Sequence, residues 1–173
     1  MTRHHLAPLL ATALAVLLLC ASSYIEIPMR PVPITLQTFA VTMIAGFAGW
    51  RIGVLATCLW LAIGAAGWPV LAGGSGGIDR FAGPTAGYLF AFPLAALLVG
   101  WLSQRGWMTH MRRAFPAMLA GNMLCLLLGA AWLAAQIGIA RAVTAGLAPF
   151  LIGAAVKALA AAGIMRLASG TAR

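Results

Sequence analysis

Long uninterrupted apolar runs are the feature of this sequence that most restricts its fold. Six such runs lie near residues 6–25, 34–50, 52–68, 86–102, 116–138 and 149–168. An α-helix needs about 20 apolar residues to cross the hydrocarbon core of a bilayer, and each run approaches that length. The runs are continuous and rich in Ala, Leu and Gly, whereas strands of a membrane barrel alternate apolar and polar residues. The sequence therefore predicts an all-α integral membrane protein with six transmembrane helices, in a single domain over residues 1–173.

The composition excludes a soluble domain and makes a nucleic-acid-binding protein a poor alternative. Of the 173 residues, 63% are hydrophobic and only 8% are charged, so too little polar surface is available to face water on all sides. A net charge of +9 would suggest nucleic acid in a soluble protein. Here the basic residues separate the apolar runs instead of forming a patch. We therefore expect membrane lipid around the chain and no nucleic-acid partner.

The arginines between the runs predict how the helices are oriented. Cytoplasmic loops of membrane proteins carry an excess of Lys and Arg. If the N-terminus is cytoplasmic, seven arginines fall on the inner side and three on the outer side: Arg3, Arg51, Arg105, Arg112, Arg113, Arg166 and Arg173 against Arg30, Arg80 and Arg141. The N-terminal segment also resembles a cleavable secretory signal, but the later loops alternate consistently only if it is retained as the first span. We expect both termini in the cytoplasm and a glycine-rich outer loop between helices three and four.

The outer loop, "GGSGGIDRFAGPTAGY" over residues 73–88, contains the G-x-S-x-G pattern of serine hydrolases around Ser75. A nucleophilic serine needs a base within hydrogen-bonding distance, and all three histidines are predicted at cytoplasmic ends, across the membrane from this loop. The chain also has no P-loop motif for an ATPase site. We therefore expect a protein that is not an enzyme. An intramembrane serine hydrolase and a ligand-free interaction or scaffold protein are the alternatives.

The cysteines indicate neither a metal site nor a disulfide framework. Cys20, Cys58 and Cys125 all fall within apolar runs, and their spacing is not that of metal ligands. We expect them to be buried small apolar residues, and we expect no metal or cofactor.

A lysine inside the last apolar run is the strongest indication of a binding site. A charge within a span is costly, so an intramembrane charge is a functional candidate. With a helix start at Pro149, Lys157 lies roughly 12 Å along the axis, in the outer half of the membrane. Arg80 in the glycine-rich loop, and Trp132 and Gln136 at i, i+4 spacing in the fifth run, reach the same outer level. These side chains predict an outward pocket for a small anionic molecule with an apolar body.

Small residues in the first three runs predict close helix contacts. Ala7, Ala11 and Ala15 follow one another at i, i+4 and i+8, which allows another helix to approach closely. The partner of this alanine row is either a helix of the same chain or a second protein. Gly49 and Gly53 flank the junction of the second and third runs, so we expect them to form a tight connection there.

Three segments carry a resemblance to a known family. "IPMRPVPITLQTF" (27–39), "GWPVLAGGSGGIDRFAGPTAGY" (67–88) and "APFLIGAAVK" (148–157) resemble the biotin-specific S components of energy-coupling factor transporters, the BioY family, and the resemblance extends over about residues 5–168. It implies a six-helix subunit of the bacterial inner (plasma) membrane that captures biotin. It also implies that the first loop is a lid and that helix one docks onto a transmembrane coupling protein driven by two ATPases. Action alone or as a homo-oligomer stays open.

The resemblance also suggests individual residues. With the pocket described above, it implies candidate biotin contacts at Arg80, Lys157, Asp79, Gly73, Gly74, Thr85, Tyr88, Trp132, Gln136 and Gln37, and a docking row at Ala7, Ala11 and Ala15. One position departs from the family pattern: an Asp usually precedes this lysine by three residues, and here Ala154 stands there. Asp79, Gln136 or Gln37 are the alternatives for accepting the hydrogen bonds of the ureido group. Without the acid, Lys157 is freer to meet the carboxylate of biotin.

Overall fold

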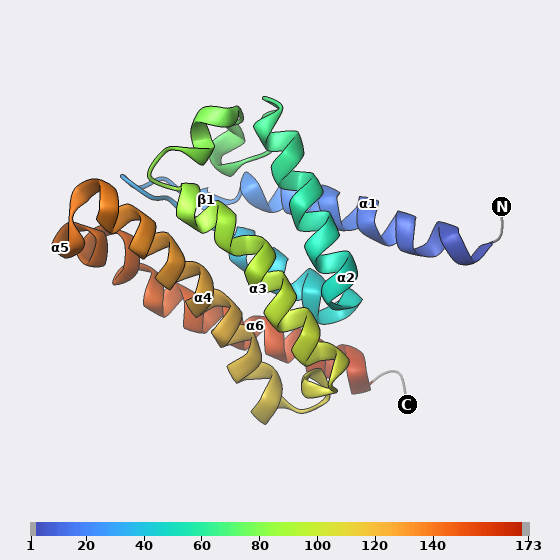
Figure 1. Cartoon of the computed structure of the whole chain (residues 1–173). Helices are drawn as coiled ribbons and strands as arrows, with labels where there is room; N and C mark the ends of the chain where they lie inside the picture. The colour runs from blue at the N-terminus through green and yellow to red at the C-terminus, as the bar shows by residue number, and fades with distance from the viewer. Residues whose placement is uncertain (1–2, 171–173) are drawn as a thin grey trace.

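The computed structural model describes residues 3–170, which form a helical bundle with a small two-stranded sheet (Figure 1). The helices and strands are α1 (Arg3–Ser23), β1 (Glu26–Ile27), β2 (Ile34–Thr35), α2 (Gln37–Ala65), α3 (Ala86–Gln104), α4 (Met111–Ile137), α5 (Ile139–Ala142) and α6 (Phe150–Gly170). Among the described residues, five helical segments are long and apolar enough to cross a membrane. The all-α membrane architecture predicted from the apolar runs is therefore confirmed.

Helix α2 contains two arms that fold back on each other at Gly49. This glycine has φ 77° and ψ 175°, which is not a helical conformation. A Cβ atom added at Gly53 would lie 3.0 Å from the Cα of Ala45, a separation that only a reversal of the chain allows. The arms correspond to the second and third predicted runs. Gly49 and Gly53 thus form the tight connection that the sequence predicts, because a residue with positive φ favours glycine.

Small residues let the helices of the bundle pack closely. A Cβ atom at Gly100 of α3 would lie 2.3 Å from the backbone nitrogen of Trp50, and one at Gly121 of α4 would lie 2.5 Å from Val99. In lipid, such close contact is what holds helices together, since burial of apolar surface gives little preference for protein over acyl chains. The main core contains the fully buried Trp60 and Met118. The leucines of α1 are mostly exposed, as lipid-facing residues are.

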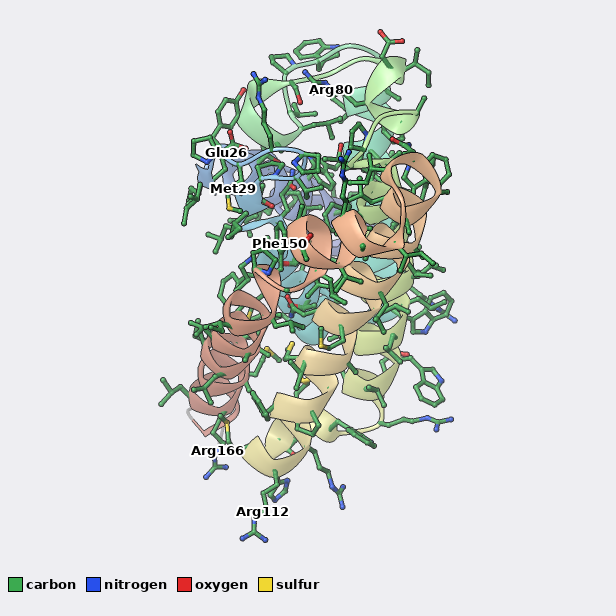
Figure 2. The ribbon with its side chains drawn as sticks, turned by 90° about the vertical axis from the view of Figure 1, so that its left-hand side faces the viewer. Glu26, Met29, Arg80, Arg112, Phe150 and Arg166 are labelled. Carbon is green, nitrogen blue, oxygen red and sulfur yellow. The ribbon has the colours of Figure 1, made fainter. Side chains whose placement is uncertain are left out.

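The loops that follow α1, α2 and α4 gather at one end of the bundle, which we call the loop end (Figure 1). The Tyr24 hydroxyl donates to the Pro69 carbonyl there, and the Trp132 indole donates to the Gly83 carbonyl over 3.1 Å. At the opposite end, Arg166 donates to the Thr109 carbonyl over 3.3 Å. Figure 2 shows Arg80 at the loop end and Arg112 and Arg166 at the other.

The three cysteines differ in their exposure. Cys125 is buried and Cys20 is half-buried, but Cys58 is exposed, so the expectation that all three are buried is wrong for Cys58. The apolar environment of a membrane accepts a cysteine on either side of a helix, so burial does not follow from position within a span. Arg173, predicted on the cytoplasmic side, lies outside the described residues.

Candidate ligand-binding site

A cavity of about 280 Å³ opens at the loop end of the bundle. This volume is close to the lower end of the range for small-molecule sites, roughly 300 to 1,000 Å³. The walls come from the β1–β2 hairpin, the glycine-rich loop and helices α2, α3, α4 and α6. Figure 2 shows Glu26, Met29, Arg80 and Phe150 in this part of the molecule. The polar lining residues are Glu26, Thr35, Gln37, Thr38, Ser75, Arg80, Thr85, Tyr88, Asn122 and Lys157.

The β1–β2 hairpin forms one wall of the cavity. Its strands pair antiparallel, with Glu26 opposite Thr35 and Ile27 opposite Ile34. The connection between them carries three prolines that all line the cavity: Pro28, Pro31 and Pro33. Because proline restricts φ and donates no backbone hydrogen bond, this segment cannot extend the sheet or become helical. The "PVPIT" motif therefore produces a short, stiff flap beside the cavity.

Lys157 connects α6 to the hairpin and to the start of α2. Its ammonium group donates to the Thr35 carbonyl and to the Thr38 hydroxyl, the second over 3.2 Å. An ammonium group has three N–H donors, so these two bonds leave one donor for a ligand. Lys157 therefore holds the wall in place and still offers a charged donor to the cavity.

Gln37 is buried in the same wall, with only 3% of its surface exposed. Its amide nitrogen donates to the Ser23 hydroxyl over 3.0 Å, and its amide oxygen accepts from the Thr35 hydroxyl over 2.9 Å. Both ends of the side chain are therefore bonded within the protein. Gln37 lines the cavity, but its main effect is to join the end of α1 to the hairpin.

Tyr88 supplies an aromatic wall. Its hydroxyl donates to the Gly146 carbonyl over 2.6 Å, and its ring centroid lies 6.4 Å from that of Phe150. Gly129 of α4 lies against the ring, because a Cβ atom there would be 2.2 Å from the Tyr88 Cδ1 atom. Tyr88 is held from three sides and presents an apolar ring to the cavity.

Arg80 and Thr85, both predicted as ligand contacts, also line the cavity. Arg80 belongs to the short 3₁₀-helix Ile78–Phe81 and is exposed, so its guanidinium lies near the mouth. Thr85 precedes the first residue of α3. The structure thus brings together five of the predicted contacts, Arg80, Lys157, Thr85, Tyr88 and Gln37, around one space.

The other predicted contacts lie outside the lining. Trp132 and Gln136 point to the glycine-rich loop: the indole bonds the Gly83 carbonyl, and the Gln136 amide donates to the Ala82 carbonyl over 3.2 Å. Both side chains therefore tether the loop to α4. Asp79 is exposed next to Arg80 and is absent from the lining.

Gly73 and Gly74 serve the packing of the loop. Both have positive φ, 64° and 67°. A Cβ atom at Gly73 would lie 2.8 Å from a carboxylate oxygen of Glu26, and one at Gly74 would lie 3.0 Å from the ring of Tyr24. The two glycines thus allow the loop to lie directly on the segment after α1, and neither lines the cavity.

Ser75 does line the cavity, but its surroundings are not those of a nucleophile. Its hydroxyl donates to the Ala72 carbonyl over 2.7 Å within the same loop. His110 lies at the opposite end of the bundle, where its Nδ1 atom is 2.8 Å from the Thr109 hydroxyl. A serine hydrolase needs a base beside its serine, and His110 cannot act as that base.

Glu26 and Asn122 are among the polar lining residues that were not predicted as ligand contacts. Glu26 is one of only two acids in the chain and directly follows the first apolar run. Asn122 is the single asparagine and lies within the fifth run. Polar side chains inside a span are rare and tend to be functional, so the position of Asn122 was a signal available in the sequence.

The alanine row of α1 is not uniformly accessible. Ala7 is exposed and Ala11 is half-buried, whereas Ala15 is only 4% exposed and belongs to the main core. The buried side of α1 includes Thr12 and Leu19, so Ala15 lies on it and Ala11 lies at its edge. Within the row, only Ala7 and Ala11 are accessible to a second protein.

Known proteins are similar to this chain in sequence and in fold. A model described as the BioY family matches residues 1–172. "Probable biotin transporter BioY" of Pyrococcus horikoshii is 37% identical over 149 residues, which cover 86% of this chain and 88% of that protein. "Biotin transporter BioY2" of Lactococcus lactis subsp. cremoris is 35% identical over 150 residues, covering 85% of this chain and 81% of that protein.

A crystal structure of the S-component for biotin from an ECF-type ABC transporter has the same fold. It superposes with a TM-score of 0.87 at 28% sequence identity, over 96% of this chain and 93% of that one. The likeness therefore includes the loop end, where the cavity lies, as well as the helices.

Proposed function

The chain belongs to the BioY family, and we propose that it is the membrane subunit that captures biotin for uptake, the S component of an ECF-type transporter. The observation that supports this proposal most directly is the cavity at the loop end, where two cationic side chains, Lys157 and Arg80, accompany an apolar aromatic wall. Biotin combines a polar ureido ring and a carboxylate with an apolar chain, which this lining suits. The family is a family of transporters, so the chain is not an enzyme.

The protein crosses the cell membrane six times, with the loop end outside. Five helices among the described residues are long and apolar enough to span, and the reversal of α2 at Gly49 supports counting its two arms as separate spans. The arginine-rich end that carries Arg112 and Arg166 faces the cytoplasm, as do both termini. In a bacterium this membrane is the inner (plasma) membrane.

Biotin lies with its ureido ring deep in the cavity and its carboxylate at the mouth. A carboxylate is costly to remove from water, and Arg80 offers a cation where the cavity is still open to solvent. Lys157 lies two helical turns below the start of α6 and is only partly exposed. Its remaining N–H donor matches the ureido carbonyl.

Biotin binding is the test of this function. We expect the purified protein, in detergent and in bilayers, to bind labelled biotin saturably and with one site per chain. Excess unlabelled biotin should displace the label. A protein that shows no saturable binding in either environment is not a biotin-capture subunit, and the ligand-free scaffold alternative would then stand.

The transmembrane coupling protein of the energy-coupling module docks on the cytoplasmic half of α1. The structural relative is the S-component of an ECF-type ABC transporter, which suggests a transporter module as the partner, and we assign the contact surface to α1. Figure 1 shows α1 extending beyond the other helices toward its N-terminus. Ala7 and Ala11 are accessible on this part of α1, and small residues let a partner helix approach.

Replacement of Ala11 by leucine should therefore separate uptake from binding. A bulky side chain holds a docking helix away, so we expect Ala11→Leu to reduce cellular biotin uptake severalfold while equilibrium binding stays within about twofold. Ala13→Leu is the matched control, because Ala13 is exposed on the opposite side of the same helix. Equal loss of uptake in both variants, or a loss of binding in Ala11→Leu, would argue against this docking surface.

A further inference from the structure

The buried nitrogen and oxygen atoms of the side chains around the cavity are nearly all bonded within the protein. Gln37 uses both ends of its amide, Tyr88 bonds Gly146, Ser75 bonds Ala72, and Lys157 bonds two groups of the hairpin segment. Asn122 is the exception. Its Oδ1 atom is the one buried side-chain nitrogen or oxygen in the described part of the chain without a hydrogen-bond partner.

The orientation of the Asn122 amide follows from its other bond. The Nδ2 atom donates to the Met118 carbonyl over 2.9 Å, one turn earlier in α4. A carbonyl oxygen only accepts, so the amide group facing Met118 must be the NH₂, and the exchanged orientation would leave two oxygens in contact. Asn122 is 1% exposed and lines the cavity, so its oxygen is a buried acceptor in the cavity wall.

Asn122 and Lys157 are the lining residues of α4 and α6 that lie farthest from the loop end. Leu126 of α4 and Ala154 of α6 belong to one buried cluster near the aromatic wall. Asn122 precedes Leu126 by one turn, and Lys157 follows Ala154 by about one turn. Because the two helices run in opposite directions, both polar residues are one turn deeper than the apolar pair, at the bottom of the cavity.

An unpaired buried acceptor costs free energy, roughly 1 to 3 kcal/mol, unless a ligand supplies the missing donor. The neighbouring lining of α4 and α6 does not supply it: Leu126, Phe150, Gly153 and Ala154 carry no polar side-chain atom, and the Lys157 ammonium bonds Thr35 and Thr38 instead. A ligand would complete the site if it placed an N–H group beside the Asn122 oxygen and its own carbonyl group beside the Lys157 ammonium.

We propose that Asn122 is a specificity-determining residue whose Oδ1 atom accepts a hydrogen bond from a ureido N–H of the bound ligand. This inference rests on the proposed function, because biotin is the molecule that brings the ureido group. Asn122 and Lys157 then form an acceptor and donor pair at the bottom of the cavity, on two different helices. The acceptor of this pair comes from α4, since Ala154 offers none on α6.

The test combines a substitution with a change in the ligand. Asn122→Leu removes the acceptor at similar size, and two cyclic carbamates of biotin replace one or the other ureido N–H by oxygen. We expect Asn122→Leu to bind biotin about tenfold more weakly. Wild type should bind one carbamate about tenfold more weakly than biotin, and Asn122→Leu should bind that carbamate with little further loss. Asn122→Asp, which keeps an acceptor, should retain the discrimination.

Stability separates ligand recognition from a structural role. Because Leu buries no unpaired acceptor, the melting temperature of ligand-free Asn122→Leu should equal or exceed that of wild type. If wild type binds biotin and both carbamates equally well, the inference fails, whether or not the variant folds. If Asn122→Leu discriminates the carbamates as wild type does, it fails as well. If wild type binds no biotin, the proposed function itself fails, which is a different result.

Discussion

Lys157→Met should weaken biotin binding by about ten- to a hundredfold. Hydrogen bonds to a charged group contribute roughly 1.5 to 3 kcal/mol, and 1.4 kcal/mol corresponds to a factor of ten in affinity. Methionine keeps the length and the apolar stem of the lysine, so the packing of α6 should survive. The loss has two sources, because Lys157 offers a donor to the ligand and also bonds Thr35 and Thr38 of the cavity wall.

The control for this variant is Val156→Met, which introduces the same side chain at the neighbouring, outward-facing position. It should bind biotin as wild type does. Equilibrium binding of labelled biotin and of an analogue with an amidated carboxylate provides the measurement. With the ureido ring next to Lys157, wild type and Lys157→Met should discriminate the amide equally.

If Lys157 instead meets the carboxylate, the amide should lose affinity only in wild type. That result would reverse the proposed orientation of biotin. A variant that binds biotin as tightly as wild type would show that Lys157 serves packing alone. The site would then rest on Arg80 and the remaining lining residues.

Gly129→Ala should destabilise the protein and impair the binding site together. The added Cβ atom would lie 2.2 Å from the Tyr88 ring, and the ring is held by its hydrogen bond to Gly146. Overpacking of this kind costs typically 1 to 3 kcal/mol. Tyr88 must move, and it forms the cavity wall with Phe150, so we expect a lower melting temperature in detergent and weaker biotin binding.

Gly163→Ala is the matched control, because no atom beyond the adjacent residues and backbone of α6 lies within 4 Å of a Cβ atom at that position. Alanine is the better helix former, so this variant should be as stable as wild type or slightly more so. A smaller side chain at position 88, as in Tyr88→Leu, should relieve part of the destabilisation caused by Gly129→Ala. Strict additivity of the two changes would contradict the proposed clash, since residues in contact are expected to couple.

The sequence by itself determined the membrane architecture and the presence of a charged site. Apolar runs of about 20 residues have one stable solution in lipid, because every backbone polar group must be bonded within a helix. Lys157 could also be singled out from the sequence, since the cost of a charge within a span depends on its depth along a single helix. The reversal at Gly49 was also local, as it follows from a glycine between two apolar runs.

Only the tertiary structure decided which residues meet in the cavity. Trp132 and Gln136 have the spacing of a ligand-binding pair, yet they bond the carbonyls of the loop, some 50 residues away in the chain. Ala15 has the spacing of a docking residue and is buried in the core. Gly73 makes room for Glu26, and the Asn122 Oδ1 atom lacks a partner because the Lys157 ammonium bonds Thr35 and Thr38 instead. Periodicity describes one helix at a time, whereas each of these roles depends on contacts between helices and loops distant in sequence.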